Sequence, residues 1–340
     1  MKADGTPFEW RGATAFRLAE LVANGRERDA DAYLAWAQAQ QLTIVRVLAM
    51  AHNLFELPPD RGRPAMARLL TMAAARGLAI EIVALADTAS FPFDIDAHVR
   101  ELGQICARAG LCTIEIANEP NHATQDRRLH DPKYLAALRR LVPAEVPCAL
   151  GADTSGDDPR GGDYVTAHFP RHDGWKHVAA LAEGFALRQR FKTPVISDEP
   201  IGAARQAVPG SRDADPERFR AAALLSRMAG LGATFHYDGG LQAVIPAGNE
   251  EACFTAWRSA WDLLPRAPIT GFRELMPSDP IALTPAPGSA WIGQAGSGLW
   301  VLAIGTSAPA QATAGQGWRL EANHVWPSSA LLGLKPSPAK

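Results

Sequence analysis

Short apolar runs alternate with longer amphipathic stretches from Phe8 to about Leu264. The longer stretches are rich in Ala, Leu and Arg, as expected of helices that bury one face, whereas most of the short runs are nearly continuously apolar. A strand that is apolar on both faces is typical of a parallel sheet covered by helices. The pattern therefore predicts repeated strand-helix units around a parallel sheet.

Eight runs are predicted to be strands: Phe8 to Ala13, Thr43 to Ala49, Ala79 to Ala86, Thr113 to Ala117, Cys148 to Ala152, Val165 to Phe169, Pro194 to Ser197 and Thr234 to Tyr237. The predicted helices include Asp31 to Gln41, Pro64 to Arg76, Asp94 to Ala109, Gly174 to Arg190 and Pro216 to Leu231. Gly77, Gly110 and Gly232 each follow a helical stretch, where a left-handed cap is expected.

Eight strands in this order favour a closed barrel over an open doubly wound sheet, because no strand leads through a Gly-rich phosphate loop into its helix. We therefore predict an α/β fold, a (β/α)8 TIM barrel over residues 1–265. After Pro265, clustered Pro and Gly separate short strands such as Ala290 to Gln294 and Leu299 to Ile304. This pattern predicts a small antiparallel β module over 266–340, with Pro265 to Pro268 as the linker and a frayed end over Lys335 to Lys340.

Composition narrows the class of protein. The 340 residues are 47% hydrophobic and 21% charged, as in an ordinary globular protein. A net charge of -2 and the absence of any Lys/Arg-rich run argue against a nucleic-acid partner. No run approaches the roughly 20 apolar residues of a membrane span, and Met1 to Pro7 lack the apolar stretch of a secretory leader. We expect a soluble chain, either cytoplasmic or secreted with its leader removed.

The cysteines are scattered along the chain. Cys106, Cys112, Cys148 and Cys253 show no C-x-x-C spacing, which argues against a zinc site and against a disulfide-rich scaffold. Since free cysteine is among the most buried residue types, we interpret all four as buried thiols.

Two glutamates follow predicted strands directly. Asn118-Glu119-Pro120 closes the apolar run from Cys112 to Ala117, and Asp198-Glu199-Pro200 closes the run from Pro194 to Ser197. Proline cannot extend a strand ladder, so each carboxyl is expected at a strand end. Cleavage of a glycosidic bond needs two carboxyls that face each other across a sugar. Glu119 and Glu199 are the candidates.

In these residues the chain resembles the clan A glycoside hydrolases, the retaining β-glycosidases that include many cellulases and mannanases. Those enzymes carry an acid/base glutamate after an asparagine at the end of strand four and a nucleophilic glutamate at the end of strand seven; Asn118-Glu119-Pro120 and Glu199 match these places. The opening Asp4-Gly5-x-Pro7-Phe8-x-x-x-Gly12 is similar to the first strand of many members.

The resemblance extends to the pocket. Arg46 matches the arginine that braces the nucleophile, and His168 matches the histidine of a His-x-Tyr pair, although Pro170 stands where the tyrosine would be. The eighth strand also lacks the tryptophan of the cellulase-like families, and Tyr237 is the candidate for the missing hydroxyl.

The resemblance implies that a charged Glu199 attacks the anomeric carbon while Glu119 donates a proton to the departing oxygen and later activates water. The two carboxyls are then expected about 5 to 5.5 Å apart, with retention of configuration. Arg46 is expected to lower the pKa of Glu199, and a second carboxylate to raise that of Glu119. Asn118 is expected to hold the sugar 2-hydroxyl.

Several further residues have two interpretations. His52 and Asn53 after strand two and Asp87 after strand three suit sugar hydroxyls, but also suit helix caps or turns. Trp175, with Phe91 and Phe93, lies in a loop where an aromatic plane stacks on a sugar or packs the loop. We assign the module tryptophans to its core rather than to a carbohydrate platform, at Trp291, Trp300, Trp318 and Trp326.

We expect neither a cofactor nor a metal. His168 and His172 are four residues apart, but Pro170 between them prevents a helical metal pair. Two alternatives to a glycosidase stay open: a noncatalytic carbohydrate-binding barrel, and a barrel hydrolase of another class. The sugar, its linkage, endo or exo action and the oligomeric state carry no motif in this sequence.

Overall fold

The fold is that of a computed structural model, which describes residues 8–151, 162–169, 174–199, 202–205, 214–305 and 311–338. Four of the sequence features interpreted above lie outside these ranges: the opening Asp4-Gly5-x-Pro7, the Pro170 position, His172 and the Pro200 that follows Glu199. The predicted strand end at Ala152 also lies outside them.

Parallel strands form the first part of the chain. They are β1 (Arg11–Thr14), β2 (Ile44–Leu48), β3 (Ala79–Leu85), β4 (Cys112–Ala117), β5 (Cys148–Ala149), β6 (Val165–Ala167), β7 (Val195–Ser197), β8 (Gly202–Ala203) and β9 (Gly232–Tyr237). Each of the eight predicted strands overlaps one of these, and the two-residue β8 is an addition that pairs with the end of β9.

The strands follow the order β5-β4-β3-β2-β1-β9-β7-β6, and every pair in this sheet is parallel. At the seam between β5 and β6 the Asp163 amide donates to the Cys148 carbonyl at 2.7 Å, and the Cys148 amide donates to the Asp163 carboxylate at 3.0 Å. The sheet is thus nearly closed, which confirms the predicted TIM barrel.

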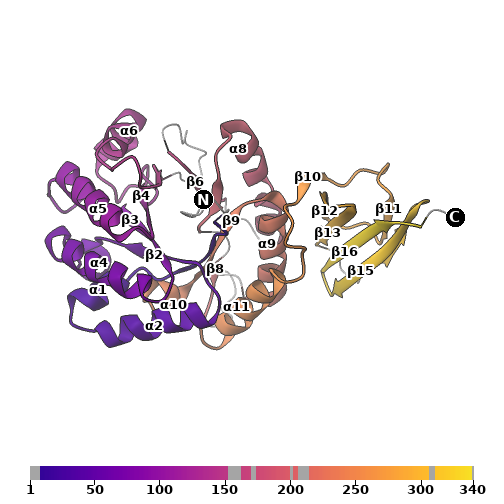
Figure 1. Ribbon diagram of the computed structural model, residues 1–340, viewed down its shortest axis with the longest axis horizontal. Helices are drawn as coiled ribbons and strands as arrows, with labels where there is room; N and C mark the ends of the chain where they lie inside the picture. The colour runs from indigo at the N-terminus through magenta and orange to yellow at the C-terminus, as the bar shows by residue number, and fades with distance from the viewer. Residues whose placement is uncertain are drawn as a thin grey trace.

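Helices cover the outside of the barrel, as Figure 1 shows. They are α1 (Leu18–Ala23), α2 (Glu27–Ala39), α3 (His52–Phe55), α4 (Pro59–Ala74), α5 (Ile95–Ala109), a 3₁₀ helix (Arg127–His130), α6 (Pro132–Arg139), α7 (Trp175–Ala180), α8 (Glu183–Phe191), α9 (Pro216–Ala229), α10 (Asp238–Leu241) and α11 (Asn249–Ala260). The side chain of Asp94 caps α5, and that of Asp215 caps α9.

Two details of the predicted helices are wrong. The single helix over Gly174 to Arg190 is divided into α7 and α8 by a turn at residues 181–182. Gly232 does not cap a helix, because Gly230, with φ +72°, takes that place and Gly232 opens β9. A Cβ on Gly232 would lie 2.5 Å from Ile196 Cδ1, so the glycine is needed for close packing of the strands.

Antiparallel strands form the second part of the chain: β10 (Thr270–Glu274), β11 (Ile281–Thr284), β12 (Ser289–Ala295), β13 (Gly298–Ile304), β14 (Gln311–Ala314), β15 (Trp318–Trp326) and β16 (Ser329–Pro336). Five of them pair in the order β10-β12-β13-β16-β15, and β11 pairs with β14. The predicted β module is confirmed. Its predicted frayed end is wrong at Lys335 and Pro336, which belong to β16.

The module packs against the barrel beside α9 (Figure 1). Its inner face places Leu302, Ile304 and Leu331 in the same apolar cluster as the barrel helices. Glu217, in the first turn of α9, accepts hydrogen bonds from the Ser328 amide and the Ser329 hydroxyl, each at 2.8 Å. A division into units 1–265 and 266–340 stays a prediction, since one apolar cluster includes residues of both.

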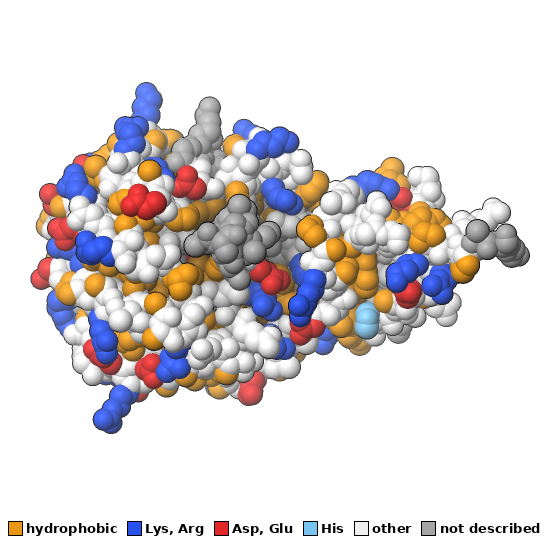
Figure 2. Space-filling model, viewed as in Figure 1, with side chains coloured by type: hydrophobic (Ala, Val, Ile, Leu, Met, Phe, Trp, Pro, Cys, Tyr) orange, Lys and Arg blue, Asp and Glu red, His pale blue; other side chains and the backbone are white. Residues whose placement is uncertain are grey.

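Acidic and basic side chains are interspersed over the face of the barrel in Figure 2, in keeping with a net charge near zero. Among the described residues, helices are all too short or too polar to cross a membrane.

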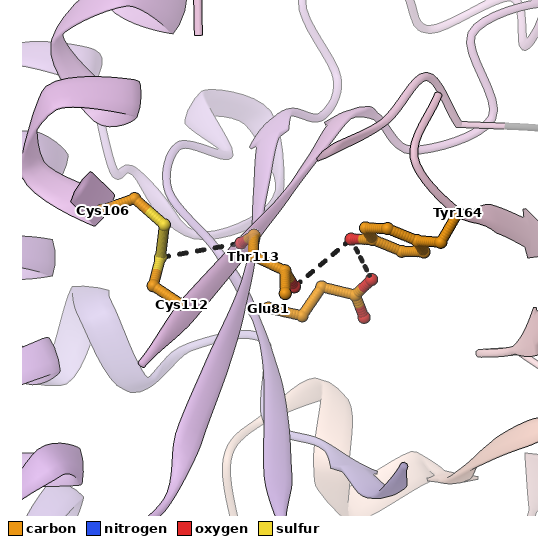
Figure 3. Close-up of a disulfide and its surroundings, with 5 residues drawn as sticks. All are labelled: Glu81, Cys106, Cys112, Thr113 and Tyr164. Atoms are coloured by element: carbon orange, nitrogen blue, oxygen red, sulfur yellow. Dashed lines mark hydrogen bonds between the residues drawn. A yellow bond between two sulfur atoms is a disulfide. The ribbon is translucent and has the colours of Figure 1, made fainter. Parts of the chain in front are cut away.

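The interpretation of all four cysteines as thiols is wrong for one pair. Cys106 near the end of α5 and Cys112 at the start of β4 form a disulfide, which Figure 3 shows beside Thr113. Cys148 and Cys253 are buried thiols, as predicted. The two disulfide cysteines lie on successive elements joined by a tight turn, a proximity that their spacing of six residues does not reveal. The bond ties α5 to the strand that leads to Glu119.

Candidate active site

Glu119 and Glu199 lie at the same mouth of the barrel. Glu119 is the second residue after β4 and Glu199 the second after β7, and parallel strands end on one side. Glu119 adopts φ +47°, a left-handed conformation that is uncommon for residues other than glycine. Such backbone outliers cluster at functional sites, and this one occurs at the predicted acid/base position.

The two carboxyl groups are close together. One carboxylate oxygen of Glu119, one of Glu199 and one ring nitrogen of His168 all lie within 4.8 Å of one another. The side chain of Glu119 is 28% exposed, whereas that of Glu199 is only 8% exposed. Solvent therefore has access to the Glu119 carboxylate, whereas the Glu199 carboxylate is enclosed by other side chains.

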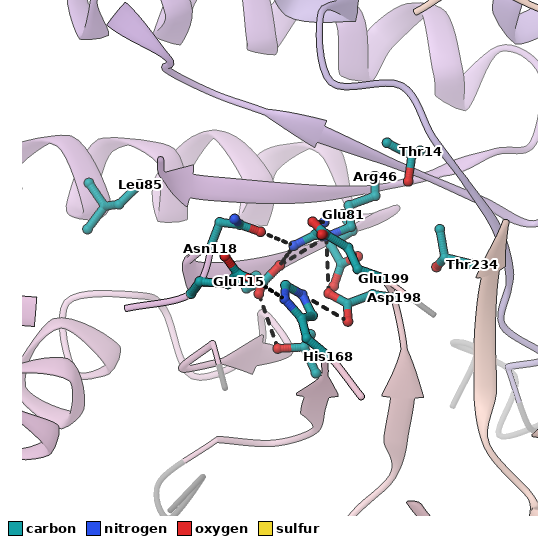
Figure 4. Close-up of polar contacts among 12 residues, drawn as sticks. Thr14, Arg46, Glu81, Leu85, Glu115, Asn118, His168, Asp198, Glu199 and Thr234 are labelled. Atoms are coloured by element: carbon teal, nitrogen blue, oxygen red, sulfur yellow. Dashed lines mark hydrogen bonds and ion pairs between the residues drawn. The ribbon is translucent and has the colours of Figure 1, made fainter. Parts of the chain in front are cut away.

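Arg46 on β2 is the centre of the polar network beneath this pair (Figure 4). Its Nη1 donates to Glu199 Oε1 at 2.6 Å, and its Nη2 donates to Asn118 Oδ1 at 2.7 Å. The same Nη2 donates to Glu115 Oε2 at 2.8 Å. Since the arginine is 1% exposed, it needs such partners, and the sequence-based expectation that it braces Glu199 agrees with this geometry.

Further buried carboxyls surround the guanidinium. Arg46 Nε lies 3.1 Å from Asp198 Oδ2 and 3.6 Å from Glu81 Oε2. Hydroxyl groups hold two of the outer carboxyls: Tyr164 donates to Glu81 at 3.0 Å, and Thr166 donates to Glu115 at 3.1 Å. Glu81, Glu115 and Asp198 are all 0% exposed. Acidic groups thus outnumber the cations that face them.

The excess of buried carboxyls raises the pKa of two of them. Burial, reinforced by the charges of Glu115 and Asp198, holds the pKa of Glu81 well above its ordinary value. Burial also raises the pKa of Glu115, to about 7, although the Arg46 charge opposes it. Burial alone would lower the pKa of Arg46, but the surrounding carboxylates outweigh it and keep the guanidinium charged. The shared interior therefore favours the protonated forms of Glu81 and Glu115.

His168 connects the two sides of the site. Its Nδ1 lies 2.9 Å from Glu119 Oε1, and its Nε2 lies 3.4 Å from Asp198 Oδ1. Burial lowers the pKa of the imidazole, but the negative charges of Glu199 and Asp198 and the close contacts with Asp198 and Glu119 raise it well above the ordinary value. The structure thus brings Asn118, Arg46, His168 and both glutamates into one cluster.

Tyr237 lies elsewhere in the barrel. It is 0% exposed, its hydroxyl is 2.9 Å from the Tyr33 hydroxyl, and it donates to the Val244 carbonyl at 2.8 Å. We correct the expectation that Tyr237 contacts the substrate, because its hydroxyl is engaged within the packing between β9, α2 and the loop after α10.

The other predicted substrate contacts are at the periphery. His52 stacks on Phe91 with ring centroids 4.0 Å apart, and Asn53 hydrogen-bonds Ser90, so the loops after β2 and β3 are joined at the mouth. His52 and Asn53 also line a polar cavity with Glu56, Pro58 and Arg61. Asp87, with φ +57°, is half-buried just after β3.

Trp175 packs between the barrel and the module. It begins α7, the Arg218 guanidinium lies 5.9 Å from its ring centre, and Gly305 of the module comes against it. These contacts favour loop packing, the second of its two interpretations, and a role as a sugar platform stays a prediction.

Two groups of side chains offer metal-ligand atoms within 4.8 Å of one another: Glu115 with His168 and Asp198, and Glu119 with His168 and Glu199. The first group fits a metal poorly, because Arg46 already contacts both Glu115 and Asp198 and would face the ion directly. In the second group, Glu199 and His168 are each held by a charged partner, Arg46 or Asp198. Ion pairs with Arg46 and His168 explain both groups better than a bound metal does.

Sequence reasoning missed Glu81 and Glu115. Each stands between two isoleucines in a mostly apolar strand, and neither is among the predicted site residues. A carboxyl at such a position requires a buried partner, and Arg46 has the same requirement on the adjacent strand. The register pairs Arg46 directly with Glu81, so the signal was present in the sequence as two lone charges of opposite sign.

No protein-family model matches this sequence, and no curated protein does either. Solved structures do resemble the fold. A family 5 glycoside hydrolase from Bacteroides vulgatus has a TM-score of 0.62 at 13% identity, covering 99% of this chain and 91% of that one. An endo-β-1,4-mannanase from Thermotoga petrophila has a TM-score of 0.56 at 11% identity, covering 98% and 93%.

A second Bacteroides vulgatus protein, provisionally assigned as a glycoside hydrolase, has a TM-score of 0.63 at 14% identity. The alignment covers 94% of this chain but 66% of that protein, so this chain spans just under two thirds of its length. The chain thus has the fold of clan A glycoside hydrolases, with a β module that follows the barrel.

Proposed function

We propose that the protein is a retaining glycoside hydrolase that cleaves β-linked oligosaccharides or polysaccharides, with Glu199 as nucleophile and Glu119 as acid/base. The observation that carries this proposal is the approach of their carboxylate oxygens to within 4.8 Å at one barrel mouth. Retaining enzymes place these groups about 5 to 5.5 Å apart, whereas inverting enzymes need about 6.5 Å or more to admit a water between them.

In the first step an oxygen of Glu199 attacks the anomeric carbon, the bond from that carbon to the leaving oxygen breaks, and Glu119 protonates the leaving oxygen. In the second step water attacks the same carbon, Glu119 takes a proton from that water, and the bond to Glu199 breaks. Arg46 donates to Glu199 at 2.6 Å and so favours its charged form.

Asn118 is suited to hold the substrate beside the nucleophile. Its Oδ1 accepts from Arg46 at 2.7 Å, which fixes the orientation of the amide and turns Nδ2 away from the guanidinium. The Nδ2 group is then the donor for the 2-hydroxyl of the bound sugar, a contact that strengthens in the transition state of such enzymes.

The test begins with a panel of 4-nitrophenyl glycosides and β-mannan, xylan and cellulose. We expect hydrolysis of a β-linked member, retention of configuration by NMR of the first-formed product, and no effect of a chelator. Glu199→Ala is expected to abolish turnover, with azide restoring release of an α-glycosyl azide. Glu119→Ala is expected to retain activity on activated leaving groups only, with azide giving the β-glycosyl azide.

The matched control is Glu251→Ala, an exposed glutamate on α11, which should keep wild-type activity. Sugar binding without turnover would instead favour a noncatalytic carbohydrate-binding barrel, and chelator-sensitive activity would favour a hydrolase of another class. Cleavage of an α-linked member alone would contradict the proposed linkage.

A further inference from the structure

Asp198 is a buried carboxyl that the double displacement does not use. It stands directly before Glu199, is 0% exposed, and lies between two cationic groups (Figure 4). Its Oδ2 is 3.1 Å from Arg46 Nε, and its Oδ1 is 3.4 Å from His168 Nε2. Neither oxygen accepts a well-aligned hydrogen bond from the described residues, so these two ion pairs hold the side chain.

The contacts form a chain that ends on Glu119. Asp198 faces one nitrogen of His168, and Glu119 faces the other at 2.9 Å. We propose that Asp198 is a positioning residue which acts on Glu119 through His168, holding the imidazole doubly protonated with Nδ1–H directed at Glu119 Oε1. The inference rests on the proposed role of Glu119 as acid/base.

The arrangement assigns different tasks to the two oxygens of Glu119. Because Nδ1–H occupies Oε1, the proton that moves is carried by Oε2. When Glu119 gives that proton to the departing oxygen it becomes a carboxylate, and the Nδ1–H bond to Oε1 stabilises the new charge. When Glu119 takes a proton from water in the second step, Oε2 is protonated again. His168 keeps both of its own protons throughout.

Arg46 makes Asp198 rigid enough for this task. The guanidinium holds Oδ2, so the carboxylate cannot rotate away from His168, and Arg46 is itself fixed by Glu115, Asn118 and Glu199. The charged groups that share this interior come from five elements or the loops that follow them: Arg46 (β2), Glu81 (β3), Glu115 and Glu119 (β4), His168 (β6), and Asp198 and Glu199 (β7).

Carboxylates surround the imidazole and favour its charged form. Glu199 and Asp198 favour the doubly protonated ring and raise its pKa against the effect of burial. A neutral ring would present a lone pair to either Asp198 or Glu119. An amide at position 198 removes the charge but nearly keeps the shape, so it isolates the electrostatic contribution.

The kinetic test uses Asp198→Asn with two substrates of the sugar that the panel identifies, a phenyl β-glycoside and a 2,4-dinitrophenyl β-glycoside. The phenyl glycoside needs protonation of its leaving oxygen, and general acid catalysis contributes roughly 10² to 10⁴-fold. We expect kcat/KM to fall by about 10²-fold on the phenyl glycoside, and by less than about 3-fold on the activated one, with KM nearly unchanged.

Glu81→Gln is the matched control. Glu81 is equally buried and also pairs with Arg46 Nε, but no contact joins it to His168. Any loss in this variant should therefore be the same on both substrates. The proposal is overturned if Asp198→Asn loses the same factor on both substrates, or if Glu81→Gln shows the same leaving-group dependence. Thermal unfolding of each variant separates loss of fold from loss of rate.

A second readout needs no turnover. In ¹⁵N-histidine NMR, with the signal assigned by His168→Gln, we expect His168 of the wild type to be doubly protonated at pH 7. In Asp198→Asn we expect its titration to move to lower pH by at least one unit. A neutral His168 in the wild type overturns the inference. If the protein cleaves no glycoside, the proposed function fails while this measurement still decides the Asp198–His168 pairing.

Discussion

Arg46 and Glu199 form a buried ion pair, Nη1 to Oε1 at 2.6 Å, between strands β2 and β7. β1 and β9 lie between these strands in the sheet, so the pair crosses the barrel interior rather than joining neighbours. The same guanidinium contacts Glu81, Glu115 and Asp198. The position of the proposed nucleophile therefore depends on residues from both sides of the barrel.

Removal of this guanidinium should destabilise the fold. Arg46→Met leaves Glu81, Glu115, Asp198 and Glu199 without their shared cation, and breaking a buried pair by removing one partner typically costs about 3–5 kcal/mol. Urea denaturation at pH 7 measures the change. Since protonation removes the repulsion, part of the lost stability should return at pH 5.

Arg68→Met is the control for this change, because Arg68 pairs with Glu27 on the surface at 2.7 Å and the pair is exposed to solvent. It should leave the urea midpoint where it is in the wild type. An Arg46→Met protein as stable as Arg68→Met would show that the carboxyls are neutral without the arginine.

A methyl group at Gly151 should displace the end of β4. Gly151 has φ +87°, and a Cβ there would lie 1.8 Å from the Ala117 carbonyl oxygen. Ala117 immediately precedes Asn118 and Glu119, so we expect Gly151→Ala to lower stability by more than about 3 kcal/mol and to abolish turnover. Urea denaturation and the glycoside assay measure both effects.

Gly25→Ala separates backbone strain from this steric clash. Gly25 has a similar φ of +73°, but nothing lies within 4 Å of its added Cβ. The substitution should cost about 1 kcal/mol and leave turnover unchanged. Equal effects of the two substitutions would mean that the contact with Ala117 is unimportant.

His98 should make the protein sensitive to mild acid. It is a fully buried residue in the first turn of α5, Arg63 Nη1 lies 3.2 Å from its Nδ1, and its Nε2 lies 3.1 Å from the Ala84 carbonyl. Burial, with the Arg63 charge, lowers its pKa to about 3. Between pH 6.5 and 3 the unfolded chain thus binds a proton that the folded protein does not, and stability falls as pH falls.

Urea denaturation of wild type and His98→Gln between pH 7.5 and 5 isolates this contribution. The wild type should lose stability as pH falls below about 6.5, and the difference between the two proteins should shrink over the same range. Parallel pH profiles would contradict the assignment of His98 as the group responsible.

Loss of the Cys106–Cys112 bond should lower stability without stopping catalysis. The bond closes a short loop, with a sequence separation of six, for which chain entropy gives about 2 kcal/mol. We expect Cys106→Ser/Cys112→Ser to unfold at a lower urea concentration with normal kcat. Thiol titration of the denatured wild type should find the two thiols of Cys148 and Cys253 before reduction and four after it.

The strands of the barrel were predictable because burial on both faces makes them continuously apolar. The two catalytic candidates were predictable because a polar motif ends each of these apolar runs. The carboxyl ends of parallel strands all lie on one side of a barrel, which places both glutamates at the same mouth. Arg46 was predictable as a residue in need of a partner. The resemblance also indicated Glu199 as its partner. The contact with Glu115 was not predictable, because it depends on the strand register, the tilt of the barrel and the length of a side chain.

Tyr237 and the cysteine pair show the limit of single-sequence inference. Tyr237 ends a strand in the expected place, but the orientation of its hydroxyl is decided by Tyr33, which lies 204 residues away. Cys106 and Cys112 belong to a helix and the next strand, and only the angle of the turn between them brings the sulfurs together. Both outcomes depend on tertiary packing, which local pattern does not encode.

Glu217 binds the turn between β15 and β16, and β16 runs away from that turn over eight residues, about 25 Å at 3.3 Å per residue. The two ends of this strand therefore differ in what they tolerate. A fluorescent tag or an affinity handle added after Pro336 would extend from the end of β16 that is remote from α9. The same insertion at Ser328 would disrupt the hydrogen bonds to Glu217 and separate the sheet from α9.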